Sequence, residues 1–143
     1  ASEFFTGVWS TALGDDELLT AVTFPRWTGR CGFAIDEIAR RHGDFAIAGA
    51  TVALALGHDD RVERCAIGLI GMGATPVRAS AAEQDAVGVA VADVDPAELG
   101  RHAMLGLDAV PADLHGSADY RLHVGAVMVA RAFSRAAEEA RRA

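Results

Sequence analysis

The stretch Phe45–Met72, FAIAGATVALALGHDDRVERCAIGLIGM, decides the fold of this chain. It holds two apolar runs, Phe45–Leu56 and Val62–Met72, joined by the four turn-forming residues Gly57–Asp60. Two apolar runs with a short polar turn between them are typical of an antiparallel β-hairpin. Alanine is frequent in the first run, so a helix over residues 45–56 is the main alternative.

The second run is apolar on both faces of its expected strand. Its alternate side chains are Cys65, Ile67 and Leu69 on one face, and Ala66, Gly68 and Ile70 on the other. Because successive side chains of a strand point to opposite faces, we expect other parts of the fold to cover both of them.

Upstream of the hairpin, the sequence predicts one more short strand. Residues Leu18–Phe24 alternate in a strand-like manner, and Pro25, which cannot donate a ladder hydrogen bond, closes the segment. Arg26–Gly32 is expected to form a loop. Phe33–Arg41 is compatible with a short helix or an irregular strand, and the helix is the favoured interpretation.

Downstream of the hairpin, the signals change to those of helices. Ser80–Glu83 matches a capping box and predicts a short helix that ends near Gly88. Asp95–Glu98 is a stronger start, with an aspartate cap, proline at the first helical position and an acidic first turn; this helix should run to about Leu105. Ser117 is expected to begin a third helix.

The third helix carries an amphipathic stripe, and its order after the strands indicates the fold class. Apolar residues recur at steps of three and four: Leu122, Ala126, Val129, Phe133, Ala136 and Ala140. Strands followed by helices predict an α+β fold, here a small antiparallel sheet of three to four strands followed by a layer of three helices.

Composition excludes several classes of function. The chain has 143 residues, enough for one domain with a core, and it is 51% hydrophobic. Its net charge is −7 and its thirteen basic residues, all arginine, are mostly scattered, which argues against a nucleic-acid partner. The longest apolar run, Phe45–Gly57, is too short for a membrane span. Cys31 and Cys65 lack a CxxC spacing and are expected to be free or structural thiols in a reducing compartment, consistent with a cytoplasmic protein.

Residue chemistry alone offers no complete active site. The five histidines make no metal-binding spacing, and no serine stands in a nucleophile elbow. Gly71–Pro76 is glycine-rich but is neither a P-loop nor a dinucleotide fingerprint; a tight strand-to-helix connection is favoured over close approach of backbone to a ligand. These residues indicate a binding or assembly domain without a metal site.

Several stretches together resemble one known family. They are EFFTG (Glu3–Gly7) with TAL (Thr11–Leu13), DELLT (Asp16–Thr20) followed by Pro25, RRHGDFA (Arg40–Ala46), GMGATPVRA (Gly71–Ala79) with Ala82–Glu83, and HGSADYR (His115–Arg121). The chain resembles the C-terminal part of the FAD-binding medium subunit of molybdenum hydroxylases, a group that includes aerobic carbon monoxide dehydrogenase and xanthine dehydrogenase. The resemblance covers nearly the whole chain, with the motifs in the family's order.

The resemblance implies a role in an electron-transfer enzyme. In this family the substrate is oxidised at a molybdenum cofactor in a large subunit, and electrons pass through 2Fe-2S clusters of a small subunit to FAD in the medium subunit, which reduces an acceptor. The C-terminal domain covers one side of the flavin ring. The resemblance therefore implies a flavin-capping and subunit-assembly domain of an oxidoreductase that is not catalytic in isolation. The alternative is a stand-alone, non-enzymatic module of the same fold that does not bind FAD.

Five residues are candidates for contact with the flavin because of the resemblance. Asp44 and Phe45 match a family loop near the isoalloxazine, where Asp44 acts by charge or hydrogen bond and Phe45 by packing. Leu19 matches a position whose backbone lies near the ring. Phe33, with Ile35, falls where some relatives carry a tyrosine. Asp36 falls where xanthine dehydrogenases carry a lysine, and a negative charge there disfavours the anionic reduced flavin.

The resemblance also implies that a partner domain grips most of the cofactor. The family binds FAD mainly through glycine-rich loops of N-terminal domains, and such loops do not occur here. Residues 1–14 are accordingly interpreted as the tail of an FAD-binding domain and residues 15–143 as the C-terminal domain. The start at Ala1, without methionine, is interpreted as that of a processed or truncated piece. The chain alone is expected to bind FAD weakly or not at all.

Overall fold

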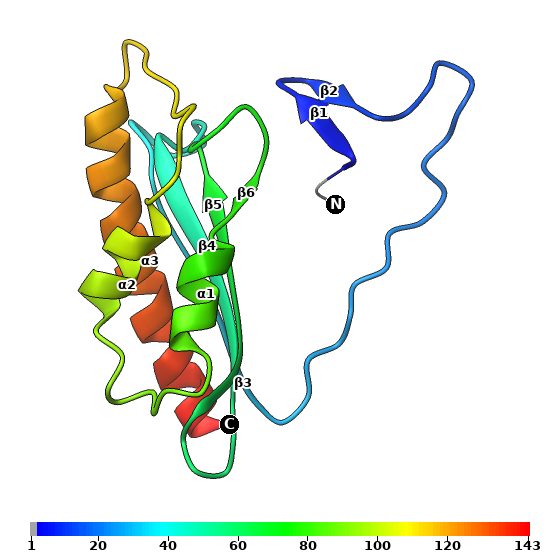
Figure 1. Ribbon diagram of the computed structural model, residues 1–143. Helices are drawn as coiled ribbons and strands as arrows, with labels where there is room; N and C mark the ends of the chain where they lie inside the picture. Colours follow the sequence, from blue (N-terminus) through cyan, green and yellow to red (C-terminus); the bar gives the residue numbers. More distant parts are fainter. Residues whose placement is uncertain (1–2) are drawn as a thin grey trace.

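A four-stranded antiparallel sheet, with helices packed on one face, makes up most of the computed structural model, which describes residues 3–143 (Figure 1). The strands of this sheet, in spatial order, are β3 (Arg30–Ile38), β4 (Ala48–Leu56), β5 (Val62–Ile70) and β6 (Val77–Arg78). The helices are α1 (Ser80–Ala86), α2 (Pro96–Ala103) and α3 (Ala118–Arg142), and a separate N-terminal hairpin consists of β1 (Phe5–Gly7) and β2 (Ser10–Thr11). The predicted α+β fold is confirmed.

The central hairpin is confirmed as strands β4 and β5. They pair from Gly49–Ile70 to Leu56–Val62, with a bulge near Ala55. The helix alternative for residues 45–56 is therefore wrong. Asp60, at φ 60°, closes the turn and receives a hydrogen bond from the Arg30 side chain of 2.6 Å.

The helix favoured for Phe33–Arg41 is wrong, because these residues belong largely to β3. The strand pairs with β4 over nine residues, from Arg30–Leu56 to Ile38–Ala48. A local helical preference is weak compared with nine cross-strand pairs, and this tertiary pairing decides the conformation. The loop expected over 26–32 is correspondingly shorter, since β3 begins at Arg30.

The strand expected over Leu18–Phe24 is also wrong. No strand forms between Thr11 and Arg30; this arm, residues 12–29, is extended but has no strand partner. Leu18 and Phe24 are each 82% exposed. The alternating pattern is present, but a strand needs a neighbour to receive its backbone hydrogen bonds. The arm runs apart from the sheet before it enters β3 (Figure 1). The first two residues of the segment 1–14 lie outside the described residues.

The core lies between the sheet and the helices, so only one face of the sheet is fully covered. On that face the side chains of β4 and β5 are buried: Ala48, Ala50, Val52, Leu54, Leu56, Val62, Cys65, Ile67 and Leu69. On the other face, Ala66, Gly68 and Ile70 remain half-buried. The expectation that both faces of β5 are covered is therefore wrong for residues 3–143.

Helix α3 packs across the sheet, close to β3 and β4. Val129, Phe133, Ala136 and Ala140 of the predicted stripe are buried, whereas Leu122 and Ala126 are only half-buried. A Cβ atom on Gly32 would overlap the carbonyl oxygen of Ala136, so a glycine is required where α3 crosses β3.

All three predicted helices form, and their caps were predicted correctly in two of three places. Asp95 accepts hydrogen bonds from the amides of Ala97 and Glu98, and the Ser117 hydroxyl accepts one from Tyr120. Helix α2 ends at Ala103, two residues before the expected end.

The capping box at Ser80–Glu83 is wrong. Ser80 is already helical, and the cap position, Ala79, makes no side-chain hydrogen bond. The buried Glu83 carboxylate instead accepts the amide of Ile67 at 2.8 Å and the Arg78 guanidinium at 2.7 and 2.9 Å. The carboxylate thus provides a hydrogen-bond acceptor for the Ile67 amide of β5, because β6 has only two residues and does not pair with Ile67.

None of the helices within residues 3–143 is both long and apolar enough to cross a membrane.

Candidate functional site

The junction between β3 and β4, residues 39–47, presents the best candidate site. Gly43 has φ 82° and lets the chain turn, with the Asp44 amide donating to the Arg41 carbonyl at 3.2 Å. One oxygen of the Asp44 carboxylate accepts the amide of Phe45 at 3.1 Å, and the other lies 3.5 Å from the Arg41 guanidinium. The turn therefore holds a carboxylate beside an aromatic ring.

The Phe45 ring projects into solvent and meets the N-terminal hairpin. Its side chain is 81% exposed, and its only recorded aromatic neighbour among residues 3–143 is Trp9, edge-on at 6.1 Å between ring centroids. Trp9 is 89% exposed and has φ 61°, a rare conformation for a large side chain. Two exposed aromatic rings from distant parts of the chain thus meet at one edge of the molecule.

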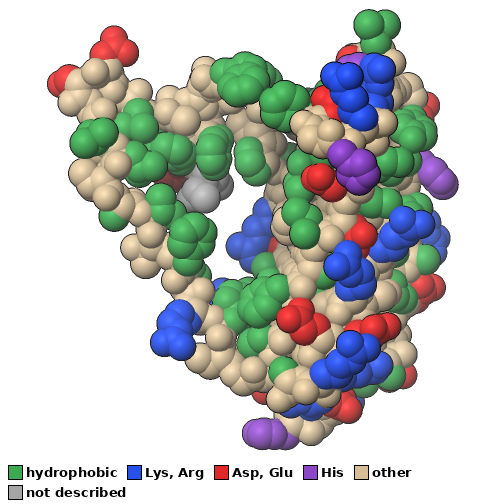
Figure 2. All heavy atoms as spheres, turned by 180° about the vertical axis from the view of Figure 1, so that it is seen from behind, with side chains coloured by type: hydrophobic (Ala, Val, Ile, Leu, Met, Phe, Trp, Pro, Cys, Tyr) green, Lys and Arg blue, Asp and Glu red, His purple; other side chains and the backbone are tan. Residues whose placement is uncertain are grey.

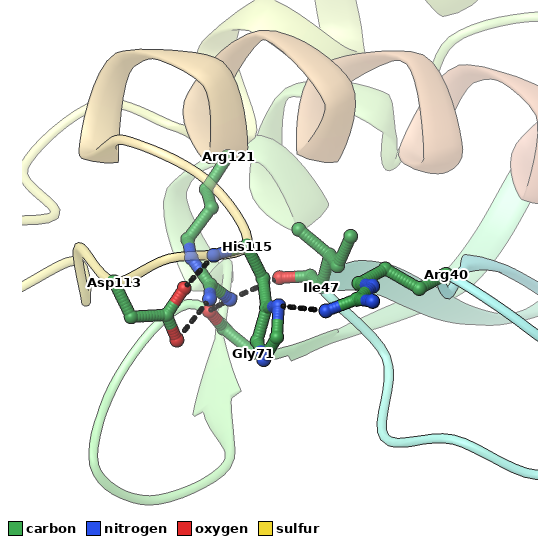
Figure 3. Close-up of polar contacts among 6 residues, drawn as sticks. All are labelled: Arg40, Ile47, Gly71, Asp113, His115 and Arg121. Atoms are coloured by element: carbon green, nitrogen blue, oxygen red, sulfur yellow. Dashed lines mark hydrogen bonds and ion pairs between the residues drawn. The ribbon is translucent and has the colours of Figure 1, made fainter.

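Next to the junction, Arg121 of α3 is an almost fully buried cation at 5% exposure (Figure 3). Its guanidinium donates to the carbonyl oxygens of Ile47 and Gly71, the latter at 3.4 Å, and to the Asp113 carboxylate at 2.8 Å. Arg121 therefore joins the start of β4, the end of β5 and the loop before α3. Its Nε has no hydrogen-bond partner in the part of the chain that the structure describes.

The Asp113 carboxylate holds Arg121 and the following turn together. One oxygen pairs with Arg121, and the other accepts the backbone amide of His115 at 2.8 Å. These bonds, the amide first and Arg121 next, hold the pKa of Asp113 below its ordinary value, so it is ionised at neutral pH. The His115 ring nitrogen Nδ1 lies 3.1 Å from an Arg40 guanidinium nitrogen, at the start of the junction (Figure 3).

Sequence reasoning did not assign roles to Arg121, His115 and Asp113. One signal was available: Arg121 lies in register with the buried positions Val124, Gly125 and Met128 of α3. A charged residue on the buried side of an amphipathic helix requires polar partners.

A second candidate surface is the open face of the sheet, opposite the helices. It holds a groove of about 820 Å³, bordered by Phe33 and Ile35 of β3 and by Val77 of β6. Its floor is made of small side chains of the two central strands: Thr51, Ala53, Ala66 and Gly68. Phe5 of the N-terminal hairpin also lines it.

Phe33 is part of an aromatic cluster at one end of this groove. Its ring lies 5.9 Å from that of Trp27, and the Arg64 guanidinium lies 3.9 Å above the Trp27 ring. This is a cation–π arrangement. Phe33 is 51% exposed, so one side of its ring is available for contact.

The other candidate residues lie elsewhere. Asp36 lies on the helix-facing side of β3, opposite to Phe33, and pairs with Arg135 of α3 at 2.9 Å. Leu19 lies in the arm and is 51% exposed. Asp44 and Phe45 are consecutive residues of the junction, whereas Asp36 and Phe33 lie on opposite faces of β3.

These residues fit the ring of a flavin but not its pyrophosphate. Phe45 and Trp9 are exposed aromatic side chains with the Asp44 carboxylate next to Phe45, which suits a planar heterocycle with polar edges, whereas Phe33 offers an exposed ring in the separate groove on the sheet face. A pyrophosphate needs several backbone amides converging at a glycine-rich turn and a helix start. The Gly71–Gly73 turn leads into β6, and its Gly71 carbonyl accepts from Arg121.

No other cluster within residues 3–143 offers chemistry of its own. No three His, Cys, Asp or Glu side chains in this part of the chain are placed to hold a metal ion. Cys31 and Cys65 are both free. Burial, followed by the nearby Glu83 carboxylate, raises the pKa of Cys65 to about 12, so this thiol is not a nucleophile at neutral pH.

Comparison with known proteins gives a consistent result. The family model described as the CO dehydrogenase flavoprotein C-terminal domain matches residues 33–136. The chain is 38% identical over 125 residues to the 6-hydroxypseudooxynicotine dehydrogenase complex subunit alpha of Paenarthrobacter nicotinovorans, covering 87% of this chain and 42% of that protein. It is 33% identical over 143 residues to the carbon monoxide dehydrogenase medium chain of Afipia carboxidovorans, covering 99% and 48%.

Solved structures with a similar fold come from the same kind of enzyme as these relatives. A carbon monoxide dehydrogenase from Hydrogenophaga pseudoflava superposes with a TM-score of 0.88 at 28% identity, and quinoline 2-oxidoreductase from Pseudomonas putida 86 with a TM-score of 0.83 at 28% identity. Each alignment covers 96% of this chain and 47% of the other chain. The chain thus spans about half the length of the relatives it matches.

Proposed function

This chain belongs to the CO dehydrogenase flavoprotein C-terminal domain family, and from that membership we propose that it is the flavin-capping and subunit-assembly domain of the FAD subunit of a molybdenum hydroxylase. The observation that supports capping is the β3–β4 junction, where Asp44 and the exposed Phe45 ring stand side by side at one edge of the molecule. The domain is not catalytic in isolation.

We propose that an N-terminal FAD-binding domain covers the open face of the sheet. Exposed large apolar residues gather on the hairpin, the arm and this face: Phe5, Val8, Trp9, Leu13, Leu18, Leu19, Val22, Phe24, Phe33 and Ile35. Figure 2 shows hydrophobic side chains on both sides of the hollow between the arm and the sheet. An apolar surface of this extent marks an interaction site. The relatives have about as many further residues as this chain has.

The cofactor, when bound, supplies two-electron redox chemistry between the iron–sulfur clusters of a small subunit and an external acceptor. The molybdenum cofactor, where substrate is oxidised, belongs in a large subunit. Phe45 would pack at the edge of the flavin ring and exclude water there. Asp44 would present a carboxylate, already oriented by the Phe45 amide, to the ring's polar edge.

The other candidates would act at longer range or through packing. Phe33 and Leu19 would contribute apolar contact from the sheet face and from the arm. The Asp36 charge is balanced by Arg135, so its electrostatic effect on a nearby ring would be smaller than that of a free carboxylate. We further propose residues 1–14 as the tail of the FAD-binding domain, residues 15–143 as the capping domain, and a cytoplasmic location.

None of the relatives described above favours a stand-alone module without FAD, since each is named as a dehydrogenase subunit or comes from an oxidoreductase. The discriminating test uses the flavoprotein that contains this domain together with the FAD-binding domain.

In that flavoprotein, replacement of Asp44 by Asn should raise the midpoint potential of the flavin, because removal of a negative charge beside the ring favours the reduced form. The potential is measured by spectroelectrochemical titration, with Asp93→Asn, an exposed carboxylate between α1 and α2, as the matched control. Equal potentials for both variants and the wild type would count against the proposed cap.

A further inference from the structure

We propose that Arg121, Asp113 and His115 form a clamp that holds the β3–β4 junction. The clamp thereby determines the positions of the Asp44 and Phe45 side chains. The clamp itself rests only on contacts within this chain. Its consequence for a flavin rests on the proposed function, and the experiment separates the two.

Contacts inside the junction are too few to fix its conformation. The internal polar contacts are the backbone hydrogen bond from the Asp44 amide to the Arg41 carbonyl, the hydrogen bond from the Phe45 amide to the Asp44 carboxylate, and the ion pair between the Arg41 and Asp44 side chains at 3.5 Å. In that pair the Arg41 side chain is 81% exposed, and exposed ion pairs contribute little to the stability of one conformation. Among residues 3–143, Phe45 has a single aromatic neighbour, Trp9, itself almost fully exposed.

The far end of the junction is fixed by Arg121. Its guanidinium donates to the carbonyl of Ile47, two residues after Phe45, while the Ile47 amide donates to the Ile38 carbonyl at 2.8 Å. Both backbone groups of Ile47 are therefore engaged. Because Arg121 is buried, its position is set by the polar groups that balance its charge, chiefly Asp113.

The near end of the junction is joined to His115 through Arg40, in a contact of 3.1 Å between two exposed side chains. The same carboxylate serves both ends, since one Asp113 oxygen binds Arg121 and the other binds the amide of His115, whose ring meets Arg40. A loop joined at both ends to one polar network can keep an exposed ring in place; Figure 3 shows the two anchors, of which Arg121 is buried and His115 is exposed. Arg121, Asp113 and His115 are accordingly positioning residues.

The first measurement is amide hydrogen exchange on the 143-residue chain. His115→Ala removes the anchor at Arg40 and leaves the buried Arg121 network, so the domain should stay folded. We expect Asp44–Ala46 amides to exchange about tenfold faster, with exchange in β4, β5 and α3 unchanged. His123→Ala, an exposed histidine of α3, is the matched control and should leave all rates unchanged.

Limited trypsin digestion gives an independent readout on the same variants. Arg40 and Arg41 are cleavage sites inside the clamped segment, and cleavage there should accelerate in His115→Ala but not in His123→Ala. Junction exchange and cleavage rates that match the wild type in His115→Ala would overturn the clamp.

The second measurement uses the flavoprotein that also contains the FAD-binding domain. In His115→Ala we expect a shifted flavin absorption spectrum and a higher KM for the electron acceptor, with no change in the rate at which substrate reduces the flavin. His115→Asn, which restores an acceptor for Arg40, should recover part of the wild-type spectrum. If the junction loosens and Asp44→Asn changes the flavin but His115→Ala does not, the positioning role is overturned. If the junction loosens and neither variant affects the flavin, the clamp stands and the capping function fails.

Discussion

Cys65 shows how burial determines the chemistry of a single residue. Its side chain is 5% exposed and faces the helices, close to the buried Glu83 carboxylate that pairs with Arg78. Burial and the Glu83 charge both oppose ionisation, which places its pKa at about 12. Because the folded-state pKa lies above the ordinary value of 9.0, this thiol stabilises the fold below about pH 9, and that contribution is lost as the pH rises toward 12.

The two cysteines should therefore differ in reactivity. With iodoacetamide at pH 8, the half-buried Cys31 should be alkylated and Cys65 should not, because the thiolate is the reacting form. Intact mass should show one adduct under native conditions and two after denaturation. Two adducts on the folded chain would mean that Cys65 is neither buried nor protonated as described.

At the scale of elements, two glycines of α2 and α3 differ in what an added side chain would meet. In α2, a Cβ on Gly100 would overlap the backbone carbonyl of Ala126 in α3. In α3, a Cβ on Gly125 would lie 3.0 Å from the Met104 sulfur and 3.2 Å from Met72, the ends of two flexible side chains. The Ala126 carbonyl cannot move without shifting α3, whereas the Met104 and Met72 side chains can adopt other rotamers.

Alanine at these two positions should have opposite effects. Gly100→Ala should lower the free energy of unfolding by about 1–3 kcal/mol through overpacking, despite a helix-propensity gain of about 1 kcal/mol. Gly125→Ala should be neutral or stabilising by up to about 1 kcal/mol. Urea denaturation of both variants measures this; a Gly100→Ala variant as stable as Gly125→Ala would contradict the close α2–α3 contact.

The edge of the sheet at β3 is covered by side chains of α3. Glu139 accepts the amide of Phe33 at 2.8 Å, and Arg135 donates to the carbonyl of Ile35 at 3.1 Å. Both groups point away from β4 and would otherwise be available to another strand. Charged side chains that bind edge groups in this way discourage pairing between sheets of different molecules.

At the scale of the whole molecule, the two faces of the sheet differ. One face is packed against three helices and forms the core, while the other looks toward the arm and the N-terminal hairpin (Figures 1 and 2). The exposed apolar side chains on this second side are consistent with a neighbouring domain, and they do not supply groups for a pyrophosphate.

The isolated 143-residue chain should therefore bind FAD weakly or not at all. Contacts to the flavin ring alone cannot replace the hydrogen bonds that a pyrophosphate makes with backbone amides. The chain is mixed with FAD, passed through gel filtration and scanned near 450 nm; a chain with its core intact should emerge colourless. Flavin that stays bound at stoichiometric amounts would show that the domain holds a complete site.

The sequence by itself determined the α+β class, the central hairpin, the caps at Asp95 and Ser117, and the buried stripe of α3, because each depends on residues near one another in the chain. It also carried enough family-specific motifs to indicate the family. What only the tertiary structure decided were features that depend on distant partners. Phe33–Ile38 became a strand because β4 pairs with it, and Leu18–Phe24 did not because no strand adjoins it. The Glu83 carboxylate, which was expected to cap α1, instead accepts a backbone amide of β5. The Arg121 guanidinium donates to the carbonyl of Ile47, 74 positions away. Such contacts are selected by the free energy of pairing buried polar groups, which local sequence patterns do not encode.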